Sequence, residues 1–545
     1  MEHCIKNPIL AGSYPSPSIV RVEDDFYLVC ASYSYFPGIP IFHSRDLAHW
    51  EQIGHVLDRK EQLPLNAEMM SHGIWAPTIR YHDGLFYVST TNVDHGFNFI
   101  VTAADPAGPW SNPYWIRGTY GIDPSLFFDE DGKVYYLTTG SSPEYRNQNI
   151  YLSEFDIRHF QLIGLRTAIW NGAMKDVWTP EAPHLYKKDD WYYLITAEGG
   201  TEHFHAVSVA RSRNICGPYE GYAGNPVLTH RHLGISYPIT NVGHGDLVEL
   251  KDGSWYMAVL ASRPYGGYHK NMGREAFLVP VSWENGWPLV SPGTGKVEWS
   301  YPAPKLPCFH VESEAERDEF EKDRLDFYWI FLGTPEENTC RIEESRLKLR
   351  LSKFSFKKEK FDAFFEKIEP AVQSASFLGR RQKHMDFDIA AKLEFSPKEQ
   401  QTAGIMLLQN DFHLLALECA LTEEGSVIRV VKGYASLEGS LTFKENTDTY
   451  QREILGQLMW ESPVSVLKVK VRGQDAAFYV RDEAGKQTVA AEHVDCSFLG
   501  FETSGGMLGT CVGMFASGNG RDYDEYAAFD WFEYRGLESD KLISM

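Results

Sequence analysis

Residues 178–195 read Trp178-Thr-Pro-Glu181-Ala-Pro-His-Leu-Tyr-Lys-Lys-Asp-Asp-Trp-Tyr192-Tyr-Leu-Ile, which is a carboxylate between two prolines, a charged turn and an aromatic strand. Asp-Asp between two such runs predicts a hairpin, because these residues tolerate the positive φ of tight turns. The same plan occurs four more times in the first 260 residues. We call the residue in the place of Glu181 the marker residue of each copy, and the five marker residues are Ser16, Ala76, Asp123, Glu181 and His244.

Five copies of one hairpin predict a repeat architecture. Each marker residue is followed, 11 or 12 positions later, by a tyrosine at 27, 87, 135, 192 or 256. A spacing of roughly 50–60 residues suits one four-stranded propeller blade with its loops. Residues 1–298 are therefore expected to form a five-bladed β-propeller. Equivalent blade positions surround one axis, so the marker residues should converge at one end of the channel and form a site.

Residues 308–545 have a different pattern. Short runs such as Arg346-Leu-Lys-Leu-Arg-Leu and Val464-Ser-Val-Leu-Lys-Val-Lys-Val alternate apolar and polar residues. This period of two predicts an antiparallel, jelly-roll-like β-sandwich with one wet face. Residues 290–307 are rich in Pro, Gly and Ser and are expected to be a linker. No acid flanked by prolines recurs after it, which favours an accessory domain.

Composition excludes several classes of protein. A chain of 545 residues is too long for one core, and 43% apolar and 14% aromatic residues are typical of a folded protein. A net charge of -22 argues against nucleic acid or an anionic membrane as partner. The eight cysteines lack the close pairs of a zinc site, and no run approaches a membrane span. The opening Met-Glu-His-Cys lacks a hydrophobic signal region, so we expect cytoplasmic residence.

Glu181 and Asp123 are the candidate catalytic acids. Prolines stiffen the backbone around Glu181, and a rigid acid beside another acid has a raised pKa suited to general-acid catalysis. Two carboxylates at a sugar-sized separation are the usual groups for glycoside hydrolysis. A salt-bridged glutamate and a turn-capping aspartate are the structural alternatives.

Five further residues are candidates for binding. His244 is a proton carrier, a metal ligand or a hydrogen-bonded core histidine, although a lone histidine is weak evidence for a metal. Arg263 follows the aromatic strand of the fifth blade and is either a counter-charge or a donor to substrate hydroxyls. Trp75, Tyr33 and Phe36 are candidate platforms for sugar stacking, with core packing as the alternative.

With these residues in view, residues 1–298 resemble glycoside hydrolase family 43, whose five-bladed propeller enzymes include β-xylosidases and α-L-arabinofuranosidases. The second domain looks like the β-sandwich of the β-xylosidase branch. The matching motifs are Asn7-Pro-Ile-Leu-Ala-Gly-Ser-Tyr-Pro15-Ser-Pro-Ser-Ile-Val, Phe36-Pro-Gly-Ile, His43-Ser-Arg-Asp-Leu, Trp75-Ala-Pro, Ile122-Asp-Pro-Ser-Leu, Glu181-Ala-Pro-His-Leu-Tyr, Gly243-His-Gly-Asp-Leu-Val, Gly273-Arg-Glu-Ala-Phe, Leu378-Gly-Arg-Arg-Gln and Phe529-Asp-Trp-Phe-Glu-Tyr.

The resemblance implies an inverting hydrolase that cuts single pentoses from the non-reducing end of xylo-oligosaccharides or arabino-substituted oligosaccharides. In its terms Glu181 is the general acid, and Asp123 tunes its pKa and orients it. Arg263 binds hydroxyls of the terminal sugar, while Trp75 and Tyr33 wall the pocket.

The resemblance also concerns the channel and the second domain. His244 lies on the axis where family members hold water or sometimes Ca²⁺, and no other cofactor is expected. The loop Ser504-Gly-Gly-Met507-Leu-Gly of the sandwich would close part of the pocket. Similar enzymes are often dimers or tetramers, so a homo-oligomer is expected.

One departure concerns the general base, which in the family is the aspartate of Pro-Asp-Pro-Ser. This chain has Ser16 there, and serine cannot take a proton from water near neutral pH without a base of its own. Three explanations remain open. The serine is an engineered knock-out, or it is a natural change with the base supplied elsewhere, by Asp94 or Glu198. In the third, the protein binds or senses sugars without efficient hydrolysis.

Overall fold

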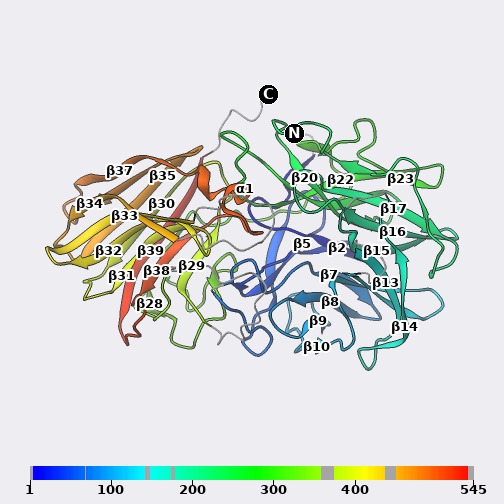
Figure 1. Cartoon of the computed structure of the whole chain (residues 1–545), viewed down its shortest axis with the longest axis horizontal. Coiled ribbons are helices and arrows are strands. Elements are labelled where there is room, and N and C mark those ends of the chain that lie inside the picture. The colour runs from blue at the N-terminus through cyan, green and yellow to red at the C-terminus, as the bar shows by residue number, and fades with distance from the viewer. Residues whose placement is uncertain are drawn as a thin grey trace.

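The computed structural model describes residues 4–67, 69–141, 148–173, 178–356, 373–435 and 450–537. Figure 1 shows two lobes, a propeller coloured blue to green and a sandwich coloured yellow to red. Nearly all regular structure in the described residues is β-strand, and the one α-helix, α1, covers only Phe501–Ser504. The prediction of an all-β chain, with a five-bladed propeller followed by a β-sandwich, is confirmed.

Each blade is an antiparallel sheet that adds strands outward from the channel. The first blade contains β2 (Ser18–Val22), β3 (Asp25–Val29), β5 (Gly38–Ser44) and β6 (Glu51–Leu57), and the second contains β7 (Thr78–His82), β8 (Leu85–Asn92), β9 (Phe97–Ala103) and β10 (Tyr114–Trp115). The third contains β11 (Ile122–Phe128), β12 (Val134–Ser141), β13 (Gln148–Asp156) and β14 (Gln161–Trp170), and the fourth contains β15 (Glu181–Lys188), β16 (Trp191–Glu198), β17 (Ala206–Ser212), β18 (Glu220–Gly221) and β19 (Leu228–Thr229). The fifth contains β20 (Thr240–Glu249), β21 (Trp255–Ser262), β22 (Glu275–Glu284) and β23 (Trp287–Val290).

The predicted hairpin turns have the positive φ that their residues tolerate. Asp83 and Asp189 lie at positive φ, 47° and 54°, in the turns of the second and fourth blades. The ring is closed by β1 (Cys4–Lys6), which pairs with β24 (Ser300–Pro302), two residues past the predicted end of the first domain. The amino-terminal segment thereby holds the last blade against the first.

The sandwich consists of two sheets around a core of Phe, Leu, Ile and Val side chains. One sheet contains β25 (Arg317–Asp318), β27 (Cys340–Glu343), β28 (Arg346–Arg350), β39 (Tyr526–Leu537), β30 (Asp386–Glu394), β35 (Val464–Arg472), β36 (Asp475–Arg481) and β37 (Gln487–Asp495). The other contains β34 (Tyr450–Met459), β33 (Gly425–Ala435), β32 (His413–Thr422), β31 (Thr402–Asn410), β38 (Cys511–Ser517), β29 (Ser376–Arg381), β26 (Ile330–Leu332) and β4 (Tyr35–Phe36). Alternate residues of β35 are buried, as the period of two predicts.

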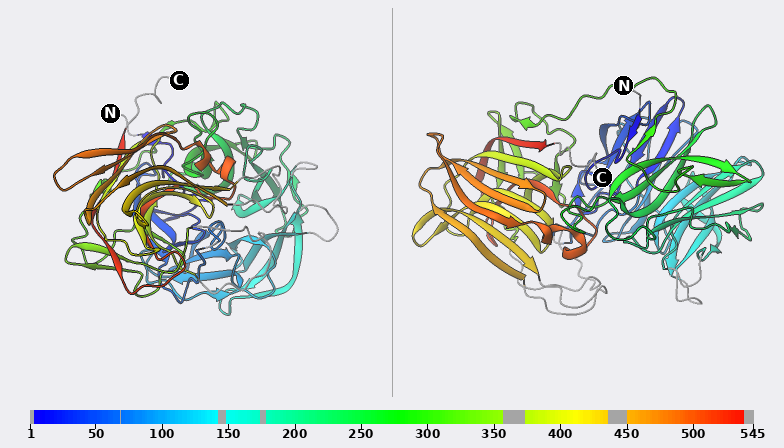
Figure 2. Two further views of the ribbon diagram at one scale, coloured as in Figure 1. Left: turned by 60° about the vertical axis from the view of Figure 1, so that its left-hand side comes forward. Right: turned by 90° about the horizontal axis from the view of Figure 1, so that it is seen from above.

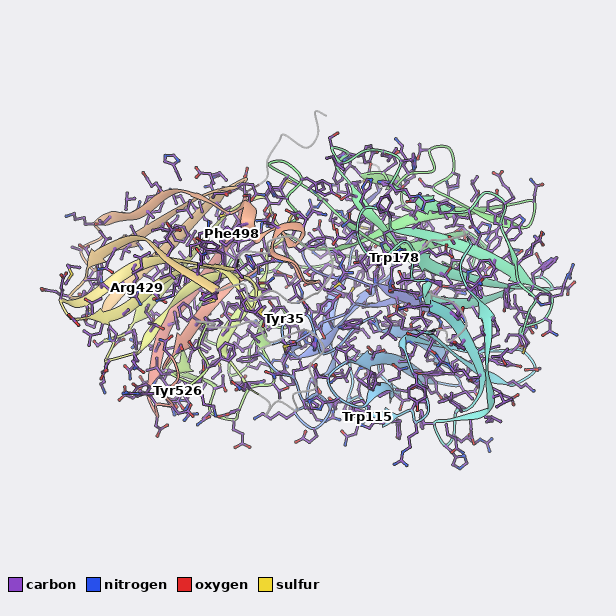
Figure 3. The ribbon with its side chains drawn as sticks, in the orientation of Figure 1. Tyr35, Trp115, Trp178, Arg429, Phe498 and Tyr526 are labelled. Atoms are coloured by element: carbon purple, nitrogen blue, oxygen red, sulfur yellow. The ribbon has the colours of Figure 1, made fainter. Side chains whose placement is uncertain are left out.

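The strand β4 joins the two lobes, because it leaves the first blade and pairs with β26 of the sandwich. Tyr35 lies at this junction (Figure 3), and the views of Figure 2 show the lobes in contact. The residues just after the predicted linker are also held against the first blade, since the amide of Phe309 donates to Asp46 Oδ2 over 2.8 Å. In the part of the chain that the structure describes, no helix has the length and apolar character needed to cross a membrane.

Candidate active site

The inner strands β2, β7, β11, β15 and β20 surround the channel; four marker residues lie within two residues of the start of their strand, and His244 is the fifth residue of β20. Ser16, Asp123 and His244 share a positive φ of 54° to 55°, which non-glycine residues seldom adopt. In each case the residue four positions later pairs with the tyrosine of the blade, as Val20 pairs with Tyr27. Backbone and register therefore confirm that these three positions are equivalent.

The fourth blade is shifted by one residue from the predicted repeat. The residue with the shared backbone is Ala182, at φ 46°, and the tyrosine in register with it is Tyr193, which pairs with Tyr186. Glu181 precedes the equivalent position. The Glu181 side chain therefore starts one residue earlier in its blade than the Asp123 side chain does in its own. This offset allows the two carboxylates to approach each other from neighbouring blades.

Asp123 and Glu181 form an electrostatically coupled pair. The amide of Ala182 donates to Asp123 Oδ2 over 3.1 Å, which ties the third blade to the fourth beside Glu181. Burial raises the pKa of Asp123, and the neighbouring Glu181 carboxylate raises it further. Burial also raises the pKa of Glu181, and Thr179 and Arg274 offset only part of this effect. Such a pair keeps one proton near neutral pH, as a general acid requires.

The cation beside the acids is Arg274. Its positive charge acts on the pKa values of Asp123, Glu181 and Tyr33. Its Nη2 donates to the Tyr33 hydroxyl and, over 3.1 Å, to the carbonyl of Met507. Arg274 lies inside the motif Gly273-Arg-Glu-Ala-Phe quoted above, but the sequence analysis did not select it.

Arg263, which was selected, has another partner. Its guanidinium makes a two-pronged ion pair with the buried Glu275, over 2.6 and 2.8 Å. Glu275 in turn accepts the amide of Gly12 over 2.7 Å. Neighbouring residues of an extended chain point to opposite sides, so Glu275 faces Arg263 while Arg274 faces the acids. Arg263 thus lies outside the cluster formed by the acid pair.

The predicted pocket walls Tyr33, Trp75 and Met507 are brought together. Ser71 links two of them, because its carbonyl accepts the Trp75 indole N–H and its hydroxyl oxygen accepts the Met507 amide, both over 3.1 Å. Tyr33, Trp75 and Met507 pack in one apolar cluster between propeller and sandwich. The sandwich loop that carries Met507 therefore contacts Arg274 and Ser71 of the propeller.

Phe36 has a structural position instead. It is buried in the core of the first two blades, and its backbone pairs with Phe331 in the sheet of the sandwich. The ring belongs to this core and not to the apolar cluster that contains Tyr33, Trp75 and Met507. Membership of the sandwich sheet accounts for its burial.

Ser16 lies two residues before the first inner strand, β2, and is almost fully buried. The two alternative bases are engaged elsewhere. Asp94 accepts from Gly73 N over 3.1 Å and binds His72 Nδ1 over 2.6 Å. Glu198 accepts the amide of Ala173 over 2.8 Å, and burial raises its pKa.

His244 lies on the axis with His184 and His205 around it, and burial lowers the pKa of His244 below its ordinary value. Arg80 Nη2 donates to His184 Nδ1 over 3.0 Å, so the proton of the neutral ring is on Nε2. That Nε2 is buried without a protein partner among the described residues. It can donate to water but cannot bind a cation while protonated.

A salt bridge in the channel also disfavours Ca²⁺. Asp246 accepts both guanidinium nitrogens of Arg80, over 3.0 and 3.1 Å, and the hydroxyls of Ser18 and Tyr186. Its oxygens are therefore saturated, while Ca²⁺ requires six to eight oxygen ligands. Within the described ranges, one group of three side chains could hold an ion, namely Asp46, His49 and Cys308, which lies by the linker. His184 and Asp246 therefore offer no ligand atom to Ca²⁺ beside His244.

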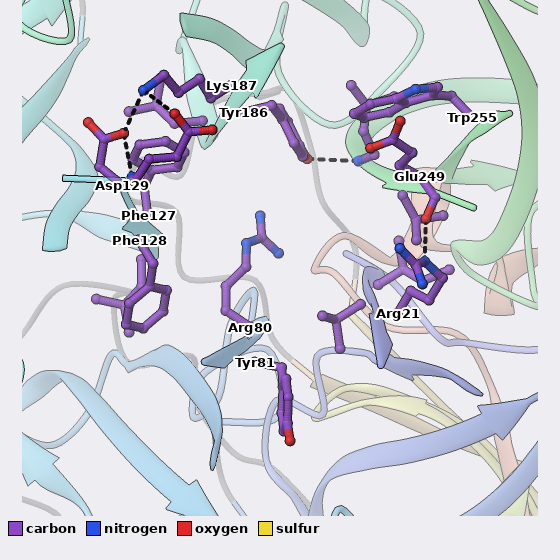
Figure 4. Close-up of a pocket in the computed structure, with 17 residues that line it drawn as sticks. Arg21, Arg80, Tyr81, Phe127, Phe128, Asp129, Tyr186, Lys187, Glu249 and Trp255 are labelled. Atoms are coloured by element: carbon purple, nitrogen blue, oxygen red, sulfur yellow. Dashed lines mark hydrogen bonds and ion pairs between the residues drawn. The ribbon is translucent and has the colours of Figure 1, made fainter. Parts of the chain in front are cut away.

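The same salt bridge separates two ends of the channel. A cavity of about 390 Å³ lies beyond it, lined by later residues of the inner strands, with Arg80 in its middle (Figure 4). The acid pair is at the opposite end. Four blades contribute to this salt-bridged closure, so the channel is closed between the cavity and the acid pair.

Comparison with known proteins gives two matches to family models. The model described as glycosyl hydrolases family 43 matches residues 5–288, and the model of a β-xylosidase C-terminal concanavalin A-like domain matches residues 317–535. A xylosidase/arabinosidase of Butyrivibrio fibrisolvens is 43% identical over 96% of this chain and 98% of its own. A non-reducing end α-L-arabinofuranosidase of Bacteroides ovatus is 36% identical over 98% of this chain and 96% of its own.

Solved structures agree with these matches. A xylan β-1,4-xylosidase of Bacillus halodurans superposes with a TM-score of 0.88 at 32% identity, covering 97% of this chain and 100% of the other. A family 43 protein of Bacillus licheniformis gives a TM-score of 0.84 at 34% identity, covering 98% and 100%.

Proposed function

The chain belongs to glycosyl hydrolase family 43 and is a glycosidase, and from this premise we propose that it releases single pentoses from the non-reducing end of xylo-oligosaccharides, with inversion at the anomeric carbon. Xylose is the first candidate sugar. L-Arabinose is the second, because one close relative is named a non-reducing end α-L-arabinofuranosidase.

The observation that carries this proposal is the pair of neighbouring acids, Glu181 and Asp123, on one side of a closed channel. A pocket closed behind the acids admits a chain end but cannot be threaded by a polymer. The salt bridge between Arg80 and Asp246 supports this closure on the propeller side. The loop that carries Met507 narrows the entrance from the sandwich side.

The proposed reaction divides between two faces of the sugar. Glu181 gives its proton to the glycosidic oxygen, so the leaving sugar departs as a neutral hydroxyl. Asp123 keeps that proton on Glu181 until the transition state. Arg274 donates to hydroxyls of the terminal sugar, as a fixed guanidinium beside the acids can. Water attacks the anomeric carbon from the opposite face, and residue 16 lies where the family places the base that takes the proton of this water.

Ser16 leaves this set incomplete. A serine hydroxyl holds water by hydrogen bonds but is far too weak a base to take its proton near neutral pH. We therefore propose that the chain hydrolyses slowly and that position 16 is the missing component. A sugar-binding or sensing protein is the second candidate function, and Ser16 is the observation that favours it.

Product analysis tests the proposal. The protein is incubated with xylobiose, xylotriose, soluble xylan, and aryl β-D-xyloside and α-L-arabinofuranoside, and products are separated by chromatography. Xylose from both oligosaccharides, seen first as the α-anomer by NMR, is expected. Oligomers released from the middle of xylan, or β-xylose as the first product, would overturn exo-acting inversion.

A further inference from the structure

The three most exposed aromatic side chains of the described residues lie within a few positions of candidate site residues in the chain. Tyr120, Trp178 and Phe204 are 78%, 72% and 66% exposed, and the other exposed aromatics lie at 55% or below. Tyr120 is three residues before Asp123, and Trp178 is three residues before Glu181. Phe204 directly precedes His205, which lies beside His244. Large apolar rings left in water around a pocket are typical of a ligand-binding surface.

The backbone at Trp178 is fixed close to the acid. Its carbonyl accepts the amide of Gly199 over 2.8 Å, and the carbonyl of Pro180 accepts the hydroxyl of Thr139 over 2.6 Å. Thr139 belongs to β12 of the third blade, so this segment is held between two blades. The exposure of the Trp178 ring is therefore a property of an anchored segment.

The backbone segments that carry Tyr120 and Phe204 are also anchored, on either side of the Trp178 segment. The carbonyl of Tyr120 accepts Arg166 Nη2 over 2.6 Å. Gly199 lies at φ +87°, and a Cβ there would meet the carbonyl oxygen of Phe204 at 2.2 Å, so the loop with Phe204 folds back onto the residue that binds Trp178. Glu202 in that loop binds Lys270 Nζ over 3.2 Å.

We propose that Tyr120, Trp178 and Phe204 form an aromatic rim that binds the sugars following the cleaved pentose, in effect the second and third units of a xylo-oligosaccharide. The inference rests on the proposed function, since it assigns the leaving-group side of the same site. Pyranose rings present flat C–H faces that pack on aromatic rings, and a chain leaving a blind pocket must pass over its rim. The rim makes the enzyme selective for oligosaccharides over simple glycosides.

Chain-length dependence tests the rim. Trp178→Ala, Phe204→Ala and Tyr120→Ala are made in a Ser16→Asp background, and kcat/KM is measured for methyl β-D-xyloside, xylobiose, xylotriose and xylotetraose. Leu165→Ala is the matched control, because Leu165 is 90% exposed and lies on β14. We expect Trp178→Ala to lower kcat/KM for xylotriose by about 3- to 10-fold, from the usual worth of one ring contact. Methyl β-D-xyloside, which has no second sugar, should change less than about twofold.

The outcomes separate the two proposals. If the Ser16→Asp protein cleaves no xyloside, the proposed function fails. If it cleaves xylosides but all three rim variants keep the parent ratio of xylotriose to methyl xyloside, the rim inference alone is overturned. Trp178→Phe should keep most of the ratio, because it retains a ring. Equal melting temperatures of all variants exclude misfolding as the cause.

Discussion

The backbone amide of Ala182 donates to the carboxylate of Asp123 over 3.1 Å, so the acid of the third blade is bound to the residue that follows Glu181. The hydrogen bond fixes two carboxyls from different blades beside each other. Burial of both carboxyls, and after it their mutual repulsion, is the reason that one proton stays on the pair.

Asp123→Asn should shift the pH dependence of catalysis. An amide oxygen still accepts from Ala182, but its charge is gone, so Glu181 ionises more easily. In the Ser16→Asp background, the alkaline limb of kcat/KM should move to lower pH. An unmoved limb would contradict the coupling.

The same substitution should change stability in a defined pH window. The pKa of Asp123 is raised in the folded state, so its contribution is complete below the unfolded value near ~3.9 and is lost as pH rises through the folded value. Relative to the parent, Asp123→Asn should therefore increase the free energy of unfolding at pH 8 but not at pH 4. Urea unfolding at both pH values measures the difference.

Ser16→Asp should restore the general base. General-base assistance typically contributes 10²–10⁴-fold, or roughly 3–5 kcal/mol of barrier. We expect about that gain in kcat on xylobiose, with a smaller change in KM, because the base acts in the transition state. If the Ser16 protein already hydrolyses xylobiose fast and Ser16→Asp leaves kcat unchanged, another residue is the general base, and Asp94 and Glu198 should be substituted next.

Glu181→Gln should discriminate between leaving groups. In the Ser16→Asp background, kcat on xylobiose should fall by about 10²–10⁴-fold, because xylose needs a proton to leave. A 4-nitrophenyl xyloside, whose leaving group needs little protonation, should fall much less. Equal losses on both substrates would assign the acid to another residue.

Arg274 and Arg263 should differ in what their loss affects. Arg274→Ala should lower kcat/KM by about 10- to 100-fold, since a charge-assisted hydrogen bond is worth roughly 1.5–3 kcal/mol. Arg263→Ala leaves Glu275 buried and unpaired, which should lower the free energy of unfolding by about 3–5 kcal/mol. Kinetics and urea unfolding of both variants test the assignment, and a reversal of the two effects would refute it.

Ca²⁺ should have no effect on the propeller channel. Asp246 is saturated by Arg80, and His184 presents a protonated nitrogen, so neither is a ligand. Chelator or added Ca²⁺ should leave the melting temperature unchanged. A rise of several degrees with Ca²⁺ would show a site that this arrangement does not provide.

The sequence predicted the fold because hairpin chemistry repeats in each blade. It misplaced Glu181 by one residue, since the count to Tyr192 cannot show that Tyr193 is the partner in register. Arg263 and Arg274 look alike in sequence, and only the strand geometry at Glu275 assigns the ion pair. For Phe36 the sequence left a sugar platform and core packing both open, because its neighbour β26 lies about 300 residues later in the chain.

The pairing of β4 with β26 has a consequence for dividing the chain. A propeller expressed alone would present the backbone of Tyr35 and Phe36 as an unpaired strand edge, and such edges recruit other chains. It would also lose the carbonyl of Met507 that accepts from Arg274. Cutting the chain at the linker should therefore yield an aggregation-prone propeller with a wider sugar pocket. Because each lobe completes the other in this way, the two lobes should evolve as a single unit.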